Sequence, residues 1–224
     1  MTFSIVGYCK ETEMHGVAIT TSSICVGSRC PWVRAGIGAV TSQNITDPSI
    51  GNAVLTEIEN GLNANEAINK IMRNRPHAEY RQVAAVDNSG GTAHFTGSKI
   101  LGINKVSQGE HCIAAGNLLS MTDVTVAMTD RFQSSNNKHL AERLLSALEA
   151  GVEAGGEVGP THSAALLVSD TCAWPLVDLR VDWSEQPVSQ LRQCWDMYLP
   201  QMDDYVTRAL DPRNAPAYGV PGDL

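Results

Sequence analysis

The stretch MTFSIV, residues 1–6, begins a β-rich run that continues to Tyr8 and predicts a strand over residues 3–8. A polar segment ending in Gly16 follows, and then a second β-rich run at residues 17–21. Two such runs around a short polar loop that ends in glycine are typical of a hairpin. We therefore expect the N-terminal residues to lie inside a sheet, with Thr2 at the start of a strand.

Further along the chain, strand-like and helix-like segments come in groups. Strand patterns lie at 32–41, 80–86, 92–97, 111–117, 163–168 and 174–181, and helical spacing lies at 52–60, 65–73, 122–153 and 187–199. Because strict β-α-β alternation is absent, a doubly wound parallel sheet is not expected. The order fits an α+β layered fold of mostly antiparallel strands. We expect one domain over residues 1–210 and a Pro/Gly-rich C-terminal tail over 211–224.

The composition excludes several classes of protein. The chain has 224 residues, of which 43% are hydrophobic and 18% charged, and its net charge is −8. Disordered chains combine lower hydrophobicity with high net charge, and no apolar run approaches the roughly 18 residues of a membrane span. An acidic chain without a basic patch is not expected to bind nucleic acid or a membrane. Because no basic segment precedes an apolar one at the start, we expect a cytoplasmic protein.

No familiar local motif marks a site. The six cysteines have no C-x-x-C spacing, the six histidines include no i, i+4 pair, and dinucleotide, P-loop and nucleophile-elbow motifs are absent. We therefore expect no metal and no cofactor, and we expect the cysteines to be free thiols that behave as small apolar residues.

Thr2 carries the strongest indication of chemistry. Threonine is small enough to permit removal of Met1, and removal would place a free α-amine and a hydroxyl on one residue. An α-amine with a pKa of about 7.7–8.0 can take the hydroxyl proton without a histidine, which is an established way to activate a threonine nucleophile.

Stretches at 1–6, 27–43, 81–83, 116–119, 140–145, 163–168 and 178–181 together cover nearly the whole chain. In these stretches the chain closely resembles the DUF1028 family of the N-terminal nucleophile (Ntn) hydrolase superfamily. The resemblance implies a four-layer αββα sandwich, with two antiparallel sheets between helix layers. It also implies hydrolysis of a C–N amide-type bond by the N-terminal residue.

Candidate site residues follow from the resemblance and from the residues themselves. The resemblance implies a cation near the nucleophile, best matched by Arg34, whose charge would lower the pKa of the amine; a structural ion pair is the alternative. Asn117, at a strand end, is a candidate oxyanion donor or else a turn residue, and the backbone N–H groups of residues 41–43 are a second donor set. The residues expected to line the substrate pocket are Ser22, Ser23, Thr41, Ser42, Gln43, His162 and Ser163.

These observations predict an amidohydrolase that cleaves a C–N amide-type bond of a small molecule through Thr2 and an acyl-enzyme. The alternative is a non-catalytic small-molecule-binding protein on the same fold. In either case the chain is expected to form a homo-oligomer, as proteins of this superfamily often do.

Overall fold

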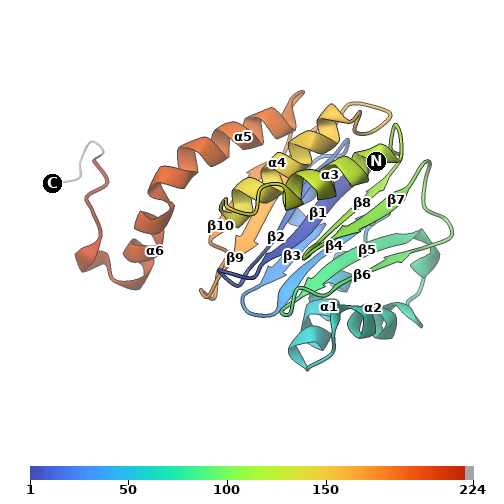
Figure 1. The fold of residues 1–224 in the computed structure, drawn as a ribbon, viewed down its shortest axis with the longest axis horizontal. Helices are drawn as coiled ribbons and strands as arrows, with labels where there is room; N and C mark the ends of the chain where they lie inside the picture. The colour runs from blue at the N-terminus through green and yellow to red at the C-terminus, as the bar shows by residue number, and fades with distance from the viewer. Residues whose placement is uncertain (220–224) are drawn as a thin grey trace.

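The computed structural model describes residues 1–219, in which two antiparallel sheets lie between layers of helices (Figure 1). The larger sheet has six strands in the order β10-β9-β2-β1-β8-β7. They are β1 (Thr2–Cys9), β2 (Met14–Thr21), β7 (Lys105–Gly109), β8 (Cys112–Asn117), β9 (Ser163–Ser169) and β10 (Val177–Val181). The predicted N-terminal hairpin is β1 and β2, and it lies at the centre of this sheet.

The smaller sheet has four strands in the order β3-β4-β5-β6. They are β3 (Pro31–Arg34), β4 (Gly38–Asn44), β5 (Arg81–Asp87) and β6 (Thr92–Thr96). The segment 32–41, whose glycines predict a pair of short strands, forms β3 and the first part of β4, joined by a turn in which Gly36 has a φ of 67°. Glycine adopts this left-handed conformation without the steric cost of a side chain.

Helices cover the outer face of each sheet (Figure 1). Helices α1 (Ser49–Glu59) and α2 (Ala64–Met72) pack on the smaller sheet. Helices α3 (Asp123–Gln133), α4 (Leu140–Glu153) and α5 (Pro187–Tyr198) pack on the larger sheet. Three separate apolar clusters fill the two helix–sheet layers and the space between the sheets. The predicted four-layer αββα sandwich is confirmed.

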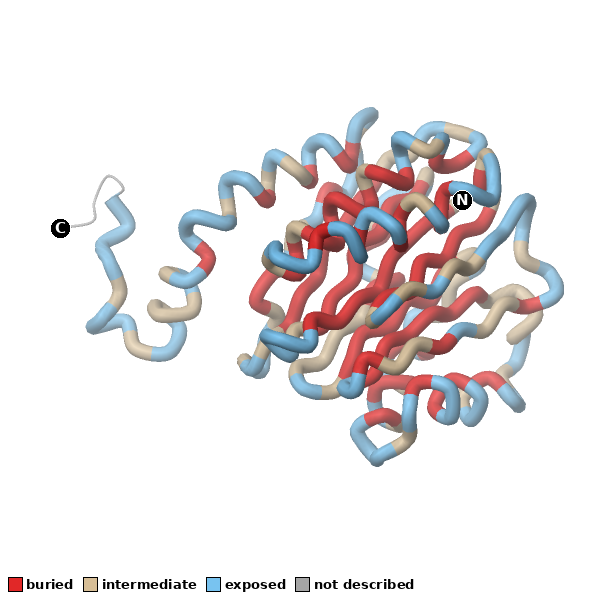
Figure 2. The backbone as a smooth tube through the Cα atoms, viewed as in Figure 1, coloured by how far each residue is buried: buried red, intermediate tan, exposed pale blue. Residues whose placement is uncertain are grey.

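Successive side chains of strand β1 point alternately into two of these layers. Phe3 and Ile5 belong to the cluster under α3 and α4, whereas Val6 and Tyr8 belong to the cluster between the sheets. All eight residues of β1 are buried because the strand is covered on both faces and paired on both edges (Figure 2). The same alternation directs the Thr2 side chain into the space between the sheets.

Two elements lie outside the predicted pattern. Strand β7 was not predicted, because its sequence KVSQG is polar and only partly buried at the edge of the sheet. Helix α6 (Met202–Leu210) was not predicted either, although its apolar residues recur at helical spacing, and it buries only Met202. Figure 1 shows α6 leading away from the sheets.

Four short 3-10 helices complete the described chain. They are η1 (Val26–Ser28), η2 (Ala78–Tyr80), η3 (Leu199–Gln201) and η4 (Pro212–Asn214). The predicted tail therefore begins with η4, and its residues 220–224 lie outside the described residues. Within residues 1–219, no helix is both long and apolar enough to cross a membrane. The six cysteines are all free, as predicted.

Gly51 allows α1 to pack against Trp32. A Cβ at position 51 would lie 2.0 Å from Trp32 Cδ1 and 2.3 Å from Cγ, so the indole or the helix would have to move. Gly51→Ala is expected to lower the free energy of unfolding by about 1–3 kcal/mol, the usual cost of overpacking a core. Urea unfolding measures this loss as a lower midpoint concentration with an unchanged m-value. Asn52→Ala, at the exposed neighbouring position, is the control, and equal stability of the two variants would contradict the steric explanation.

Candidate functional site

Thr2 is the first residue of β1 and is only 5% exposed. Its Oγ1 donates to the Met1 carbonyl at 2.6 Å and lies 3.0 Å from Thr21 Oγ1. Thr21 Oγ1 also donates to the Met1 carbonyl. Two hydroxyls therefore converge on the carbonyl of the peptide bond that precedes Thr2.

Strands β2 and β8 hold Thr2 on both sides. Thr2 pairs with Thr21 in β2 and with Asn117 in β8. Asn117 is fully buried, and its Nδ2 donates to Gln82 Oε1 at 3.1 Å while its Oδ1 has no hydrogen-bond partner. The structure thus brings Asn117 beside Thr2, as the sequence predicts, with one amide oxygen still unpaired.

A chain of buried amides joins the two sheets behind Thr2. Gln43 Oε1 accepts from Ser4 Oγ at 2.7 Å, and Gln43 Nε2 donates to Gln82 Oε1 at 2.8 Å and to the Ala115 carbonyl at 3.1 Å. Gln82 Nε2 donates to the Gly116 carbonyl at 3.1 Å. Because its amide is committed to these bonds, Gln43 fixes the two sheets relative to each other.

Thr41 and Ser42 point in opposite directions from β4. Thr41 Oγ1 is buried without a partner, on the same face of β4 as Gln43, whose amide reaches the larger sheet. Ser42 Oγ donates to the Asp47 carbonyl at 3.2 Å, and the Ser42 backbone N–H donates to the Cys30 carbonyl at 3.0 Å. The backbone N–H of Ser42 is therefore not free to stabilise an oxyanion, contrary to the sequence-based prediction.

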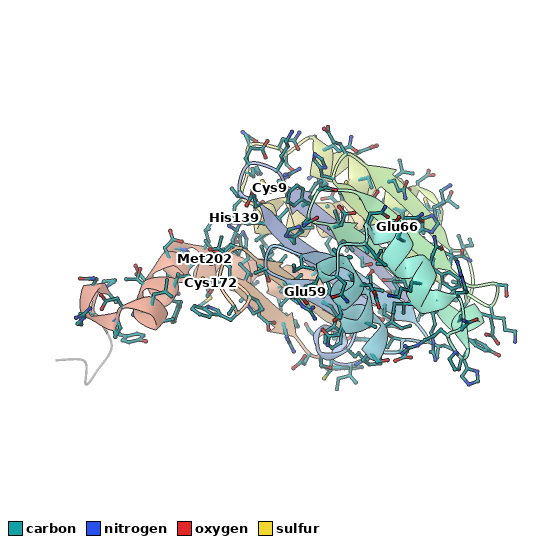
Figure 3. All side chains as sticks on the ribbon, turned by 90° about the horizontal axis from the view of Figure 1, so that it is seen from below. Cys9, Glu59, Glu66, His139, Cys172 and Met202 are labelled. Carbon is teal, nitrogen blue, oxygen red and sulfur yellow. The ribbon has the colours of Figure 1, made fainter. Side chains whose placement is uncertain are left out.

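Arg34 lies away from Thr2, which corrects the predicted cation. Its Nη1 makes a 2.6 Å ion pair with Glu59 of α1, labelled in Figure 3. Arg34 pairs with Gly38 at one end of β4, whereas Gln43 contacts Ser4 and Ala115 at the other. These ends are roughly 17 Å apart at the usual rise of a strand. The sequence places Arg34 in an early strand, but it does not determine at which end of the sheet, or on which face, the side chain lies.

The cation that the structure connects to Thr2 is Arg29. Arg29 Nη2 donates to Ser23 Oγ at 2.8 Å, and Ser23 Oγ lies 3.4 Å from Thr21 Oγ1. Arg29 Nη1 donates to the Cys25 carbonyl at 2.8 Å, which fixes the guanidinium against the loop after β2. No motif in the sequence distinguishes this arginine from other loop arginines.

Ser163 and His162 shape the same loop. Ser163 Oγ donates to the Ser23 carbonyl at 2.6 Å and accepts from the Val26 N–H at 3.1 Å. The His162 backbone N–H donates to the Thr21 carbonyl at 2.8 Å, but its ring stacks on Trp183 at a centroid distance of 4.4 Å. Both residues position the loop, and the imidazole faces Trp183.

Glu157 is the site residue that the sequence did not indicate. It follows α4, is 7% exposed, and neither carboxylate oxygen has a hydrogen-bond partner. Burial raises the pKa of its carboxyl group to about 8, although the Met1 ammonium and the backbone of Ser22 act in the opposite direction. The backbone of Ser22, which was predicted to line the pocket, lies near the Glu157 carboxyl group, but no hydrogen bond joins them.

Cys30 is a poor candidate for a second nucleophile at this site. Burial raises the pKa of the Cys30 thiol to about 11, and only the thiolate is strongly nucleophilic.

The described residues contain no group of three or more His, Cys, Asp or Glu side chains arranged to hold a metal ion.

A cavity of about 260 Å³ lies at the other end of β1, lined by residues that include Tyr8, His111 and Arg143. Tyr8 is six positions from Thr2, roughly 20 Å along an extended strand. This cavity is therefore separate from the cluster around Thr2.

Comparison with known proteins places the chain in a family. The family described as "Family of unknown function (DUF1028)" matches residues 2–191. The crystal structure of protein SPO2555 from Silicibacter pomeroyi, a protein of the same family, is 33% identical. The match covers 91% of this chain and 89% of that one, with a TM-score of 0.84.

A second solved structure, Anbu (ancestral beta-subunit) from Yersinia bercovieri, is 8% identical over 91% of this chain and 97% of that one, with a TM-score of 0.38. No curated protein matches the chain. On the family match and on the fold shared with SPO2555, the chain belongs to the DUF1028 family.

Proposed function

We propose that this protein hydrolyses a C–N amide-type bond of a small molecule, with Thr2 as an N-terminal nucleophile after Met1 is removed. The observation that carries the proposal is the convergence of the Thr2 and Thr21 hydroxyls on one carbonyl. A carbonyl held in this way is close to the nucleophilic oxygen, and positioning of this kind supplies much of an enzyme's rate acceleration.

The α-amine of Thr2 acts as the base. It takes the proton from Oγ1 while the oxygen attacks the substrate carbonyl, and it then gives this proton to the departing amine. The C–N bond breaks, and the acyl group is left as an ester on Thr2. Water, deprotonated by the same amine, hydrolyses the ester to a carboxylic acid and restores the hydroxyl.

Two neighbours favour a neutral amine at physiological pH. Arg29, linked to Thr21 through Ser23, brings positive charge to this end of β2, and nearby positive charge lowers the pKa of an amine. The Glu157 carboxyl, whose pKa burial raises to about 8, is mostly protonated at pH 7 and adds little negative charge. We assign Arg29 the role that the sequence suggested for Arg34.

Asn117 and Thr21 are the candidate donors to the oxyanion. Thr21 Oγ1 already donates to a carbonyl at this position, and Asn117 is the partner of Thr2 in β8. Loss of one such donor typically lowers the rate by about 10²–10³-fold.

Mass spectrometry tests the proposal. The intact protein is expected to lack the mass of one methionine, and a β-lactone probe is expected to add one acyl group, which peptide mapping places on Thr2. A protein that keeps Met1, or that is acylated only at other residues, would contradict the proposal and favour a binding protein on the same fold.

A further inference from the structure

The buried carboxylate of Glu157 lies in a segment that the fold holds firmly. Glu157 forms a β-bridge with Leu119, and the flanking residues donate or accept backbone hydrogen bonds on both sides, Val158 N–H to the Leu118 carbonyl at 3.1 Å and Ser120 N–H to the Gly156 carbonyl at 3.0 Å. The backbone that carries the carboxylate is thus fixed against the segment that follows β8.

This segment runs alongside Met1. A Cβ on Gly159 would lie 3.3 Å from Met1 Cε and 3.6 Å from Met1 Sδ, so the methionine side chain rests over that glycine. The charge of the Met1 ammonium also acts on the Glu157 carboxyl group. Met1 therefore shows how an aminoacyl group fits beside Thr2, with its carbonyl on two hydroxyls and its ammonium near enough to act on Glu157 without forming an ion pair.

Removal of Met1 replaces that ammonium with the α-amine of Thr2, which must be neutral to act as the base and so brings no positive charge to Glu157. A buried carboxylate with no hydrogen bond and no counter-charge is costly, and it ionises only when a partner compensates for the lost water. Burial raises the pKa of Glu157 to about 8 even though the Met1 ammonium acts to lower it. A ligand that brings a positive hydrogen-bond donor to this position gains a charge-assisted bond that a neutral ligand does not form.

We propose that the substrates are amides of α-amino acids with a free amino group, and that Glu157 binds their ammonium in the place of the Met1 ammonium. This inference rests on the proposed function, because the acyl group concerned is the one transferred to Thr2. Glu157 gives the proton that it releases on binding to solvent, and the hydrolysis itself follows the steps given above. The products are a free α-amino acid and an amine.

The test compares two substrates that differ only in the amino group. They are methionine p-nitroanilide and its des-amino analogue, 4-(methylthio)butanoyl p-nitroanilide. Wild-type protein is expected to prefer the first by about tenfold or more in kcat/KM, the effect of one hydrogen bond to a charged group. In Glu157→Gln the preference is expected to fall to near one. Glu153→Gln removes an exposed carboxylate at the end of α4 and is expected to keep the wild-type preference.

The outcomes separate this inference from the proposed function. If the β-lactone probe acylates Thr2 but wild-type protein hydrolyses both anilides equally, Glu157 does not bind the substrate ammonium, whereas the assignment of Thr2 as the nucleophile is retained. If Glu157→Gln lowers kcat/KM for both anilides by the same factor, Glu157 positions the Thr2 amine and does not bind the substrate ammonium, which also overturns it. If Thr2 is never acylated and neither anilide is hydrolysed, both proposals fail.

Discussion

Replacing Thr2 with alanine is expected to lower kcat/KM for an accepted amide by at least about 10³-fold, because no other residue in the cluster supplies an activated hydroxyl. Thr21 Oγ1 lies 3.0 Å from Thr2 Oγ1 but carries no α-amine to take its proton. The Cys30 thiol is protonated at neutral pH because burial raises its pKa to about 11. Steady-state kinetics with an anilide substrate measure the loss.

Thr2→Ser is the matched control for this prediction. Alanine, serine and threonine all permit removal of the preceding methionine, so both variants should present the same α-amine. Serine restores the hydroxyl, and Thr2→Ser is expected to recover most of the activity. Full activity in Thr2→Ala would show that the nucleophile lies elsewhere.

Replacing Glu157 with glutamine is expected to stabilise the protein at alkaline pH. The unfolded chain releases the Glu157 proton near pH 4.5, whereas the folded protein holds it up to about pH 8. The free energy of unfolding therefore falls as the pH rises through this window, and the full loss is present above pH 8. Because each pKa unit corresponds to about 1.4 kcal/mol, Glu157→Gln is expected to regain on the order of a few kcal/mol at pH 9.

Urea unfolding at pH 4 and pH 9 measures this effect. The variant and the wild type should differ little at pH 4, where the carboxyl group is protonated in both states. Glu153→Gln, an exposed carboxylate of the same helix region, should change stability by less than about 1 kcal/mol at either pH. A difference between Glu157→Gln and wild type that is the same at both pH values would contradict a buried carboxyl group with a raised pKa.

The elements that could be predicted from the sequence are those in which burial requires apolar residues at a regular spacing. The β1–β2 hairpin, α1, α2 and α4 each bury a regular set of apolar residues, and these were found close to their observed bounds. Prediction failed at β7, which has no apolar period, and at α6, whose apolar residues recur at helical spacing but are mostly not buried.

The site was predicted only where two residues are neighbours in the sheet. Thr2 and Asn117 lie together because both stand at strand ends of adjacent strands. The prediction that Arg34 is the cation near Thr2 was wrong, because its strand places it on the α1 side of the smaller sheet, where it pairs with Glu59. Glu157 was missed because a lone glutamate after a helix has the pattern of an exposed residue, and its position depends on a β-bridge with Leu119, which is distant in sequence.

The pairing of β1 on both edges has a consequence for how firmly the nucleophile is held. Chain ends usually fray, since they open at almost no cost in free energy. Here Thr2 pairs with Thr21 and Asn117 near the centre of the six-stranded sheet, so freeing it would break pairings on both sides. A terminus created at Thr2 would open only by breaking its pairing with both neighbours and exposing a buried side chain, so it is held more firmly than the end of an edge strand.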